Sequence, residues 1–433
     1  MRLHARKGSV TVPDEMARWL VEHARLLGSL SPGEPTEDLE PLRGMLNGVR
    51  VVGLGESTHG TSEFFRLKHR IVEYLVQEMG FNTLAMEASA SAARALDAYV
   101  RYGTGDPAQL VARLGFWTWR TQELLDLVKW LYAYNREVSE GQRVRFAGID
   151  PQRCADSVAA VTAVVRAVAP EQEALLREVE VLAQAAPASG PDPEQSLMAR
   201  AEAVVALLAG LRDECMRHLA ATGAPEPSGA FEEVLEHARI LVRAADLVTR
   251  PREPLPGEDS VFSARDRYMA DAVTRLVDDG SASRTVVWAH NGHISKGTYG
   301  AGVPALGSRL RDRFGDGYYA LALLFGKGSF LARRRADVHG RPVRHRIGTG
   351  LRSVEARLAD ALPGDYFVDL RTATSSPSAA WLHAPQAQRS FGAAVARFTY
   401  RFDVAPLVPA DDYDGIAFVA RSSCSHLLPP AGL

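Results

Sequence analysis

The chain has 433 residues, of which 46% are hydrophobic and 24% charged, so it can form one large or two ordinary domains with a sizeable core. A formal net charge of -2 argues against bulk electrostatic binding to nucleic acid, which usually needs a basic face. Three cysteines, Cys154, Cys215 and Cys424, have no pair spacing and therefore indicate neither a disulfide framework nor a cysteine zinc site.

Short apolar runs rich in β-branched residues recur along the chain, and most are continuous rather than alternating. Such runs are typical of strands buried on both faces of a parallel sheet. They occupy residues 49–55, 82–87, 144–150, 285–291, 318–325, 365–370 and 415–420. Helical patterns separate the first three runs, the clearest over residues 62–79, which Gly80 should end. The sequence predicts an α/β fold with a mainly parallel central sheet flanked by helices.

The middle of the chain has a different composition. Residues 155–250 are rich in Ala, Leu, Val, Glu and Arg, contain no convincing strand, and are broken by Pro- and Gly-containing segments at 186–195, 221–230 and 250–259. We expect an inserted helical subdomain over residues 155–255. The α/β catalytic domain would then comprise residues 1–154 and 256–433, with a cleft between the two parts.

The segment "GLGESTHG" at residues 53–60 first resembles a phosphate-binding loop. A dinucleotide fingerprint needs a third glycine where Thr58 stands, and Glu56 would place a carboxylate against the phosphate. Nucleotide binding is therefore disfavoured. We expect the glycines to let the chain turn tightly, so that Glu56 and His59 face a cleft.

Ionisable residues follow or end four of the predicted strands. In open α/β sheets the ligand site lies beyond the carboxyl ends of the strands. Any one such residue could be a capping carboxylate or a core histidine, but four coinciding strand ends favour a functional site. The candidates are Glu56 and His59, Glu87, Asp150, and His290 with His293.

The chemistry of these residue types suits hydrolysis of an ester. A neutral imidazole can take a proton from water while a carboxylate orients it, and a second histidine or an arginine can stabilise the developing oxyanion. The sequence contains no serine-hydrolase elbow of the form Gly-x-Ser-x-Gly. The same histidines and glutamates could instead bind zinc or manganese, and the residues alone leave both possibilities open.

Two further segments have more than one interpretation. The segment "FWTWRTQE" places Trp117, Trp119 and Arg120 before a helix, either as core aromatics or as an apolar wall with a cation for a bulky substrate. The segment "SARDRYMADAV" places Arg265 and Asp266 at a helix start, where a solvated or capping role is as well supported as a catalytic one.

Six segments together resemble the erythromycin esterase family, which includes succinoglycan-biosynthesis-like members. In chain order they are "LGESTHGTSEFFRLKHRIVEYL", "AMEAS", "FWTWRTQELLDLVKWLYAYN", "GIDPQ", "RDRYMA" and "WAHNGHI". The resemblance implies an α/β core with a helical subdomain, and metal-free, water-mediated opening of a macrolide lactone. It implies that His59 is the general base. The supporting positions that it implies are Glu56, Glu87, His290 and His293, with a basic residue at Lys68 or Arg66.

The leading hypothesis is thus a hydrolase that opens an ester or macrolactone of a bulky natural product, with no metal and no other cofactor. Antibiotic resistance would be one role for such an enzyme. The alternatives are a tailoring enzyme of secondary metabolism, using the same site for elimination, cyclisation or acyl transfer, and a metal-dependent hydrolase. The first residues carry no apolar signal-peptide segment and no apolar run reaches transmembrane length, so we expect a cytoplasmic protein without a membrane or nucleic-acid partner. The sequence does not predict an oligomeric state.

Overall fold

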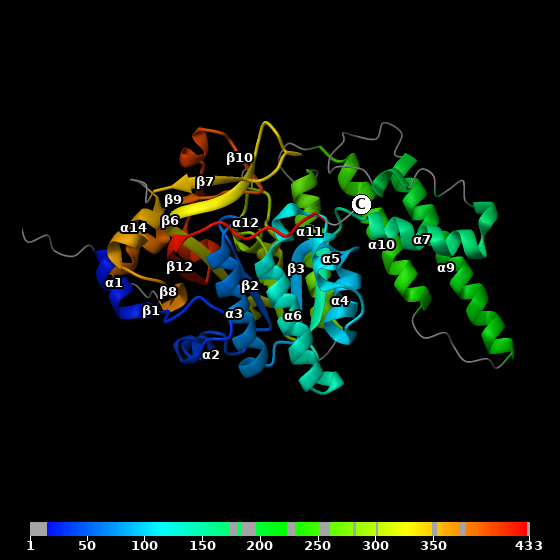
Figure 1. Ribbon diagram of the computed structural model, residues 1–433, viewed down its shortest axis with the longest axis horizontal. Helices are drawn as coiled ribbons and strands as arrows, with labels where there is room; N and C mark the ends of the chain where they lie inside the picture. The colour runs from blue at the N-terminus through cyan, green and yellow to red at the C-terminus, as the bar shows by residue number, and fades with distance from the viewer. Residues whose placement is uncertain are drawn as a thin grey trace, which may run out of the picture.

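A mostly parallel sheet forms the centre of the molecule (Figure 1). The computed structural model describes residues 15–172, 176, 180–183, 196–222, 230–251, 260–279, 283–299, 302–348, 353–372 and 377–430. In this part of the chain the sheet has ten strands, in the order β1-β8-β12-β6-β2-β5-β3-β4, with β7 and β10 paired to β6. Its strands are β1 (Arg25–Leu26), β2 (Val51–Leu54), β3 (Thr83–Ser89), β4 (Arg145–Asp150), β5 (Thr285–Trp288), β6 (Tyr318–Arg334), β7 (Val343–Ile347), β8 (Tyr366–Asp369), β10 (Ala394–Val395) and β12 (Gly415–Ser422).

The predicted α/β class with a mainly parallel sheet is confirmed. From β12 to β4 every neighbouring pair is parallel, and only β8, β1 and β7 pair in the antiparallel sense. Each of the seven apolar runs overlaps one of these strands. Every residue of β2, β3 and β5 is buried, which explains why these strands are continuously apolar rather than alternating.

Helices cover both faces of the sheet. Side chains of β2 alternate between the two layers: Val52 and Leu54 join one apolar cluster with α3, α4 and α6, whereas Val51 joins a second with α1, α11, α13 and α14. The predicted helix over residues 62–79 is α3, which ends at Gly80 in a left-handed conformation with φ 70°. The helix bounds are α1 (Glu15–His23), α2 (Pro41–Met45), α3 (Ser62–Met79), α4 (Ala93–Tyr102), α5 (Pro107–Ala112), α6 (Gln122–Glu137), α7 (Ala155–Val168), α9 (Ser196–Thr222), α10 (Ala230–Thr249), α11 (Val261–Asp278), α12 (Asn291–Ile294), α13 (Leu306–Phe314), α14 (Val354–Ala361) and α15 (Pro409–Asp412).

The middle of the chain contains α7, α9 and α10, which lie together at one end of the molecule (Figure 1). Their buried side chains, such as Val161, Leu208 and Leu241, form an apolar cluster separate from those on the sheet. The predicted break at 186–195 lies outside the described residues, as do most of the breaks at 221–230 and 250–259. The division into a catalytic domain and an inserted subdomain stays a prediction.

Strand β6 is much longer than the apolar run that predicted it. It continues to Arg334 and pairs with β7 and β10 beyond residue 325, where burial becomes irregular and the apolar signal ends. A separate two-stranded sheet, β9 (Gln386–Arg389) with β11 (Val404–Leu407), was also not predicted. The extension brings β6 to the site, because the N–H of Leu331 donates to the carbonyl of Gly60 at 2.9 Å. Among the described residues, no helix is both long and apolar enough to cross a membrane.

Candidate active site

The structure brings the ionisable strand ends together at one edge of the sheet. Strands β2, β5, β3 and β4 are adjacent and parallel, so their carboxyl ends meet. Glu56 follows β2, His290 follows β5, and Asp150 ends β4. Glu87, expected at the end of its strand, lies instead inside β3.

His59 belongs to a buried chain of three charged or polar side chains. Its Nδ1 lies 2.7 Å from Oε1 of Glu56, whose Oε2 accepts from the ammonium of Lys68 at 2.6 Å. The Lys68 ammonium also lies 4.6 Å from the ring centroid of Trp288, a cation–π distance. Lys68 and Glu56 are fully buried, whereas 8% of His59 is exposed, so only His59 reaches solvent.

The protonation states of Lys68, Glu56 and His59 follow from their contacts. Burial raises the pKa of Glu56, but the charge of Lys68 and the hydrogen bond from His59 outweigh burial and lower it. Burial lowers the pKa of Lys68 to about 8 although Glu56 opposes the shift, so the lysine remains largely cationic at neutral pH. Because an ionised Glu56 can only accept, Nδ1 of His59 carries the proton and Nε2 is left as the basic nitrogen.

An irregularity in β3 directs Glu87 into the site. The pairing of β3 with β4 shifts between Met86 and Ser89, as in a β-bulge, and bulges often redirect a side chain beside a site. Oε2 of Glu87 then accepts from the backbone N–H of His290 at 2.9 Å. Gly148 on β4 allows the close approach, because a Cβ there would overlap the carbonyl oxygen of Ser89.

Arg265, near the start of α11, joins the acidic side chains of β3 and β4. Its Nη2 donates to Glu87 Oε1 and to Asp150 Oδ2, each at 2.7 Å, and its Nε donates to Asp150 at 3.1 Å. Asp150 is fully buried, so its carboxylate is held by the guanidinium rather than presented to a ligand. Burial raises the pKa of Glu87, but His293 and Arg265 outweigh it and hold that pKa well below the usual range.

His293 lies between two carboxylates. Its Nδ1 is 2.8 Å from Asp266 Oδ1 and its Nε2 is 3.2 Å from Glu87 Oε1. Burial lowers the pKa of His293, but Asp266 and Glu87 raise it to about 10, so the ring is an imidazolium at neutral pH. Arg265 Nη1 lies only 3.0 Å from the same Nε2, and the surrounding carboxylates offset the repulsion of the two cations. Tyr299 donates to Asp266 at 2.9 Å.

His290 differs from His293 in both charge and contacts. Burial lowers the pKa of His290 to about 3, so this ring is neutral. Its Nδ1 accepts from the backbone N–H of Gly292 at 3.1 Å, as the N-cap of α12. The proton is therefore on Nε2, and this buried N–H has no hydrogen-bond partner among the described residues. A buried donor without a partner destabilises a folded protein by about 1–3 kcal/mol. A hydrogen bond from this N–H to a bound water or a substrate oxygen would remove that cost.

The aromatic segment and α3 contribute unequally to the site. Trp119 packs edge-on against His59, with ring centroids 5.4 Å apart, and its indole N–H donates to the carbonyl of Glu87 at 2.8 Å. Trp117 is also largely buried, and its indole N–H has no partner within the described residues. Of the two basic candidates on α3, Lys68 reaches the site, whereas Arg66 is exposed and donates to Ser31.

The structure gives a reason for the glycines of "GLGESTHG" other than the tight turn predicted from the sequence. None of Gly53, Gly55 and Gly60 has a positive φ, so none is required by a tight left-handed turn. Close packing requires them. A Cβ at Gly55 would overlap the amide of Asn291, and one at Gly60 would overlap the backbone of Leu331.

No cluster of three or more His, Cys, Asp or Glu side chains arranged to hold a metal ion is found among the described residues. Glu87 and Asp150, which could have supplied oxygen ligands, are bonded to Arg265. The arrangement therefore favours a guanidinium over a metal ion at this position.

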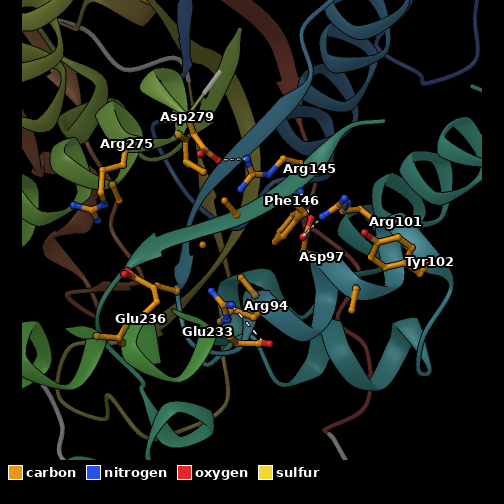
Figure 2. Close-up of a pocket in the computed structure, with 18 of the residues that line it drawn as sticks. Arg94, Asp97, Arg101, Tyr102, Arg145, Phe146, Glu233, Glu236, Arg275 and Asp279 are labelled. Atoms are coloured by element: carbon orange, nitrogen blue, oxygen red, sulfur yellow. Dashed lines mark hydrogen bonds and ion pairs between the residues drawn. The ribbon is translucent and has the colours of Figure 1, made fainter. Parts of the chain in front are cut away.

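A large cavity lies away from these residues. It measures about 800 Å³ and follows the open edge of β4, between α4, α10 and α11 (Figure 2). Its charged side chains are largely paired with one another, as in Arg145 with Asp279 at 2.7 Å and Arg94 with Glu233 at 3.4 Å. None of the strand-end candidates lines it, so we place the candidate site around His59 instead.

The roles of Arg265 and Asp266 were left open by the sequence, and Tyr299 was not singled out in the segment 299–320, which was expected to border the cleft. The structure places the first two at the centre of the charge network. The signal available in the sequence was the segment "RDRYMA", which carries part of the family resemblance.

Comparisons with known proteins agree with the fold. Over 95% of this chain and 92% of its own length, the putative hydrolase YbfO of Bacillus subtilis is 24% identical. Erythromycin esterase type II of Escherichia coli is 25% identical over 67% of this chain and 73% of its own length. A crystal structure of a protein from Bacillus cereus has a TM-score of 0.78 at 24% identity, covering 96% of this chain and 99% of that one.

A solved structure of a mutant erythromycin esterase, EreC, in its open conformation has a TM-score of 0.65 at 19% identity, covering 93% of this chain and 98% of that one. The erythromycin esterase family model matches residues 76–422. This match includes Glu87, His290 and His293 but begins after Glu56, His59 and Lys68. Because it spans most of the 433 residues, the chain belongs to the erythromycin esterase family, and family membership together with the names of its relatives indicates a hydrolase.

Proposed function

We propose that this protein hydrolyses an ester or lactone of a bulky natural product, without a metal, using water activated by His59. The observation that carries the proposal is the buried chain from Lys68 through Glu56 to His59. It leaves the basic Nε2 of His59 free beside the unpaired N–H of His290, the two rings being 5.2 Å apart.

In the proposed reaction, water loses a proton to Nε2 of His59 as its oxygen bonds to the carbonyl carbon of the ester. The imidazolium that forms is stabilised by Glu56. The N–H of His290 donates to the developing oxyanion. Collapse of the tetrahedral intermediate breaks the bond to the leaving oxygen, which takes the proton from His59. The products are a carboxylic acid and an alcohol, and His59 is neutral again.

Glu87, His293 and Asp150 are positioning residues in this proposal rather than proton carriers. Glu87 holds the backbone of His290, and Arg265 and His293 neutralise Glu87. Asp150 in turn binds Arg265. These contacts keep His290 close to His59, so its N–H dipole is already in place and requires no reorganisation during the reaction.

Trp117, Trp119 and Arg120 would line the substrate side of His59. Trp119 contacts His59 and an apolar wall beside the base suits a bulky, partly apolar substrate, but Trp119 is only 1% exposed, so contact with substrate would fall mainly to Trp117 and Arg120. Two relatives are named erythromycin esterases, so erythromycin is the first macrolide to test and resistance to it the first phenotype.

The test is turnover of a panel of macrolactones and simple esters by the wild-type protein and by His59→Ala. We expect turnover to fall by about 10²–10⁴-fold in the variant with an unchanged unfolding transition. His23→Ala, on α1 at the far end of the sheet, is the matched control and should retain activity. Incorporation of ¹⁸O from labelled water into the acid product identifies hydrolysis. An unlabelled product would instead indicate elimination or acyl transfer at the same site, and wild-type turnover by His59→Ala would refute the assignment of the base.

A further inference from the structure

Two segments near the C-terminal end of β6 are strongly basic. Residues 331–346 and 397–404 together contain eight arginines and two aspartates, although the whole chain has a formal net charge of -2. The first segment holds the β6–β7 hairpin, and the second follows β10. Strands β7 and β10 lie at one edge of the molecule, at the top of Figure 1.

Strand pairing and one buried tyrosine hold the two segments together. β10 pairs with β6 in the parallel sense, with Val395 opposite Arg334. The backbone N–H of Arg335 donates to the carbonyl of Val395 at 2.8 Å. The hydroxyl of Tyr400 donates to the carbonyl of Arg346 on β7 at 2.6 Å and accepts from the N–H of the same residue at 3.3 Å. These contacts fix the second segment against the hairpin.

One cavity of about 500 Å³ lies where the two segments meet, and arginines from both of them line it. All five are exposed, and within the described part of the chain no acidic side chain lines the same cavity. No ion pair within 4.0 Å joins any of the five to a described carboxylate. Asp403, which lies close to them in the sequence, pairs instead with Arg335 at 3.6 Å. We call the five the basic face, which consists of Arg334, Arg344, Arg346, Arg397 and Arg401.

Large apolar side chains are exposed in the same two segments. Phe398 is 74% and Phe402 80% exposed, more than any other large hydrophobic residue of the described chain. They lie two residues before and after Tyr400, which is 6% exposed, so this turn buries the tyrosine and leaves both phenylalanines in solvent. Val338 and Val404 are about half exposed. Exposed apolar groups beside basic ones are typical of an interaction surface.

Three kinds of partner carry the negative charge that would complement the basic face. They are an acidic protein, a nucleic acid and a membrane that contains anionic lipids. Phenylalanines beside arginines can stack on nucleobases, but Val338 and Val404 have no ring with which to stack. A protein partner would need a pocket shaped for each exposed apolar side chain, whereas lipid acyl chains adapt to all of them. The combination therefore favours a lipid surface, where phosphates lie directly above an apolar layer.

We propose that the basic face, with Phe398 and Phe402, binds the surface of a membrane that contains anionic lipids. The arginines contact the phosphates of the lipid headgroups, which guanidinium groups bind through paired N–H donors. The two phenylalanines enter the boundary between headgroups and acyl chains. The contact is peripheral and needs no helix that crosses the bilayer. It differs from the sequence-based expectation of a protein without a membrane partner, and it does not depend on the proposed esterase function.

Cosedimentation of the full-length protein with lipid vesicles tests the proposal. One set of vesicles contains equal amounts of phosphatidylcholine and phosphatidylglycerol, and the other contains phosphatidylcholine alone. We expect the wild-type protein to bind the anionic vesicles about tenfold more tightly or better, because each arginine near an anionic surface adds to the attraction. The difference should shrink as salt is added, since salt screens exposed charges.

Two pairs of substitutions separate the arginines from the phenylalanines. Arg344→Ala combined with Arg346→Ala should abolish the preference for anionic vesicles. The unfolding transition should stay unchanged, because both side chains are exposed and Tyr400 binds backbone atoms of Arg346. The same two positions changed to Lys should keep most of the preference, since the charges remain. Phe398→Ala combined with Phe402→Ala should keep the preference but weaken binding to the anionic vesicles by about tenfold.

The matched control is Arg311→Ala combined with Arg313→Ala. It removes the same charge from α13, where these arginines pair with Asp316 and Asp278, and it should bind like the wild type. Equal binding of the wild type to both kinds of vesicle would overturn the inference, as would undiminished binding by either the alanine pair on β7 or the phenylalanine pair. A single-stranded oligonucleotide bound through the same arginines, with no binding to vesicles, would assign the basic face to nucleic acid instead.

Discussion

His59 and His290 lie with their ring centroids 5.2 Å apart and in opposite hydrogen-bonding states. Glu56 fixes the proton of His59 on Nδ1, which leaves its Nε2 as an acceptor. The backbone N–H of Gly292 fixes the proton of His290 on Nε2, which makes that atom a donor. One ring can therefore accept a proton from water while the other donates to an oxygen, and neither has to change its tautomer first.

Replacing the donor of His290 should impair catalysis more than stability. In His290→Asn the shorter side chain still accepts from Gly292 as an N-cap, because asparagine is a preferred N-cap residue. The N–H donor is displaced from its position beside His59. We expect kcat to fall by about 10²–10³-fold, as for loss of one oxyanion donor. The free energy of unfolding should change by less than about 1 kcal/mol. A variant with near wild-type kcat would show that the oxyanion is stabilised elsewhere.

Arg265 should be a major determinant of stability. Its removal in Arg265→Met leaves Glu87 and Asp150 buried and without their cation, a change that typically costs about 3–5 kcal/mol. Arg145→Met is the matched control, because it breaks an exposed 2.7 Å ion pair with Asp279 and should cost less than about 1 kcal/mol. Chemical denaturation of both variants measures the difference. Adding Asp150→Asn to Arg265→Met should recover part of the loss, and equal costs for the two arginines would contradict the buried network.

The sequence could predict those site residues that lie at the carboxyl ends of strands. Glu56, Asp150 and His290 follow or end buried apolar runs, and parallel strands necessarily bring such positions together. Arg265 could not be assigned in this way, because its partner Asp150 is 115 residues away in the sequence. The segment around Arg265 also has the composition of an ordinary solvent-exposed helix N-terminus. Nor does an apolar run show where a strand bulges, so the position of Glu87 inside β3 was not predictable.

The long extension of β6 is a similar case. Its residues alternate irregularly between buried and exposed positions, and its pairing with β7 depends on contacts distant in sequence. The contact between Leu331 and Gly60 could therefore not be predicted from the sequence. The close packing that requires the glycines of the first loop could not be predicted either.

His293 should give stability a characteristic dependence on pH. Its pKa is raised from 6.5 to about 10, so the folded state binds its proton more tightly than the unfolded state. The resulting stabilisation is fully present below pH 6.5 and is lost as the pH rises towards 10. The free energy of unfolding of the wild type minus that of His293→Gln should thus decrease across this window. Subtraction cancels the groups common to both proteins, and a difference that does not vary between pH 6.5 and 10 would show that His293 is not held as a cation.

Gly60 should not tolerate a side chain. A Cβ at this position overlaps the carbonyl oxygen and backbone nitrogen of Leu331, and a backbone neighbour cannot rotate away as a side chain can. We expect Gly60→Ala to destabilise the protein by about 1–3 kcal/mol and to lower activity by displacing the adjacent His59. Gly44→Ala is the control, because Gly44 lies in helix α2 with open space around its missing Cβ. Thermal unfolding of the two variants should separate them, and equal transition temperatures would contradict the close approach.

Chelation should leave hydrolysis intact. A divalent cation bound by Glu87 and Asp150 would have to displace the guanidinium of Arg265, which lies 2.7 Å from both carboxylates. A cation bound by His59 and Glu56 would have to replace the proton between them and would meet the buried ammonium of Lys68. We therefore expect the purified protein to keep its activity after prolonged dialysis against a chelator, with no gain when zinc or manganese is added back. Elemental analysis of the same sample is the independent measurement. Recovery of about one metal ion per chain, with activity lost on its removal and restored on its return, would replace the histidine mechanism by a metal-activated water.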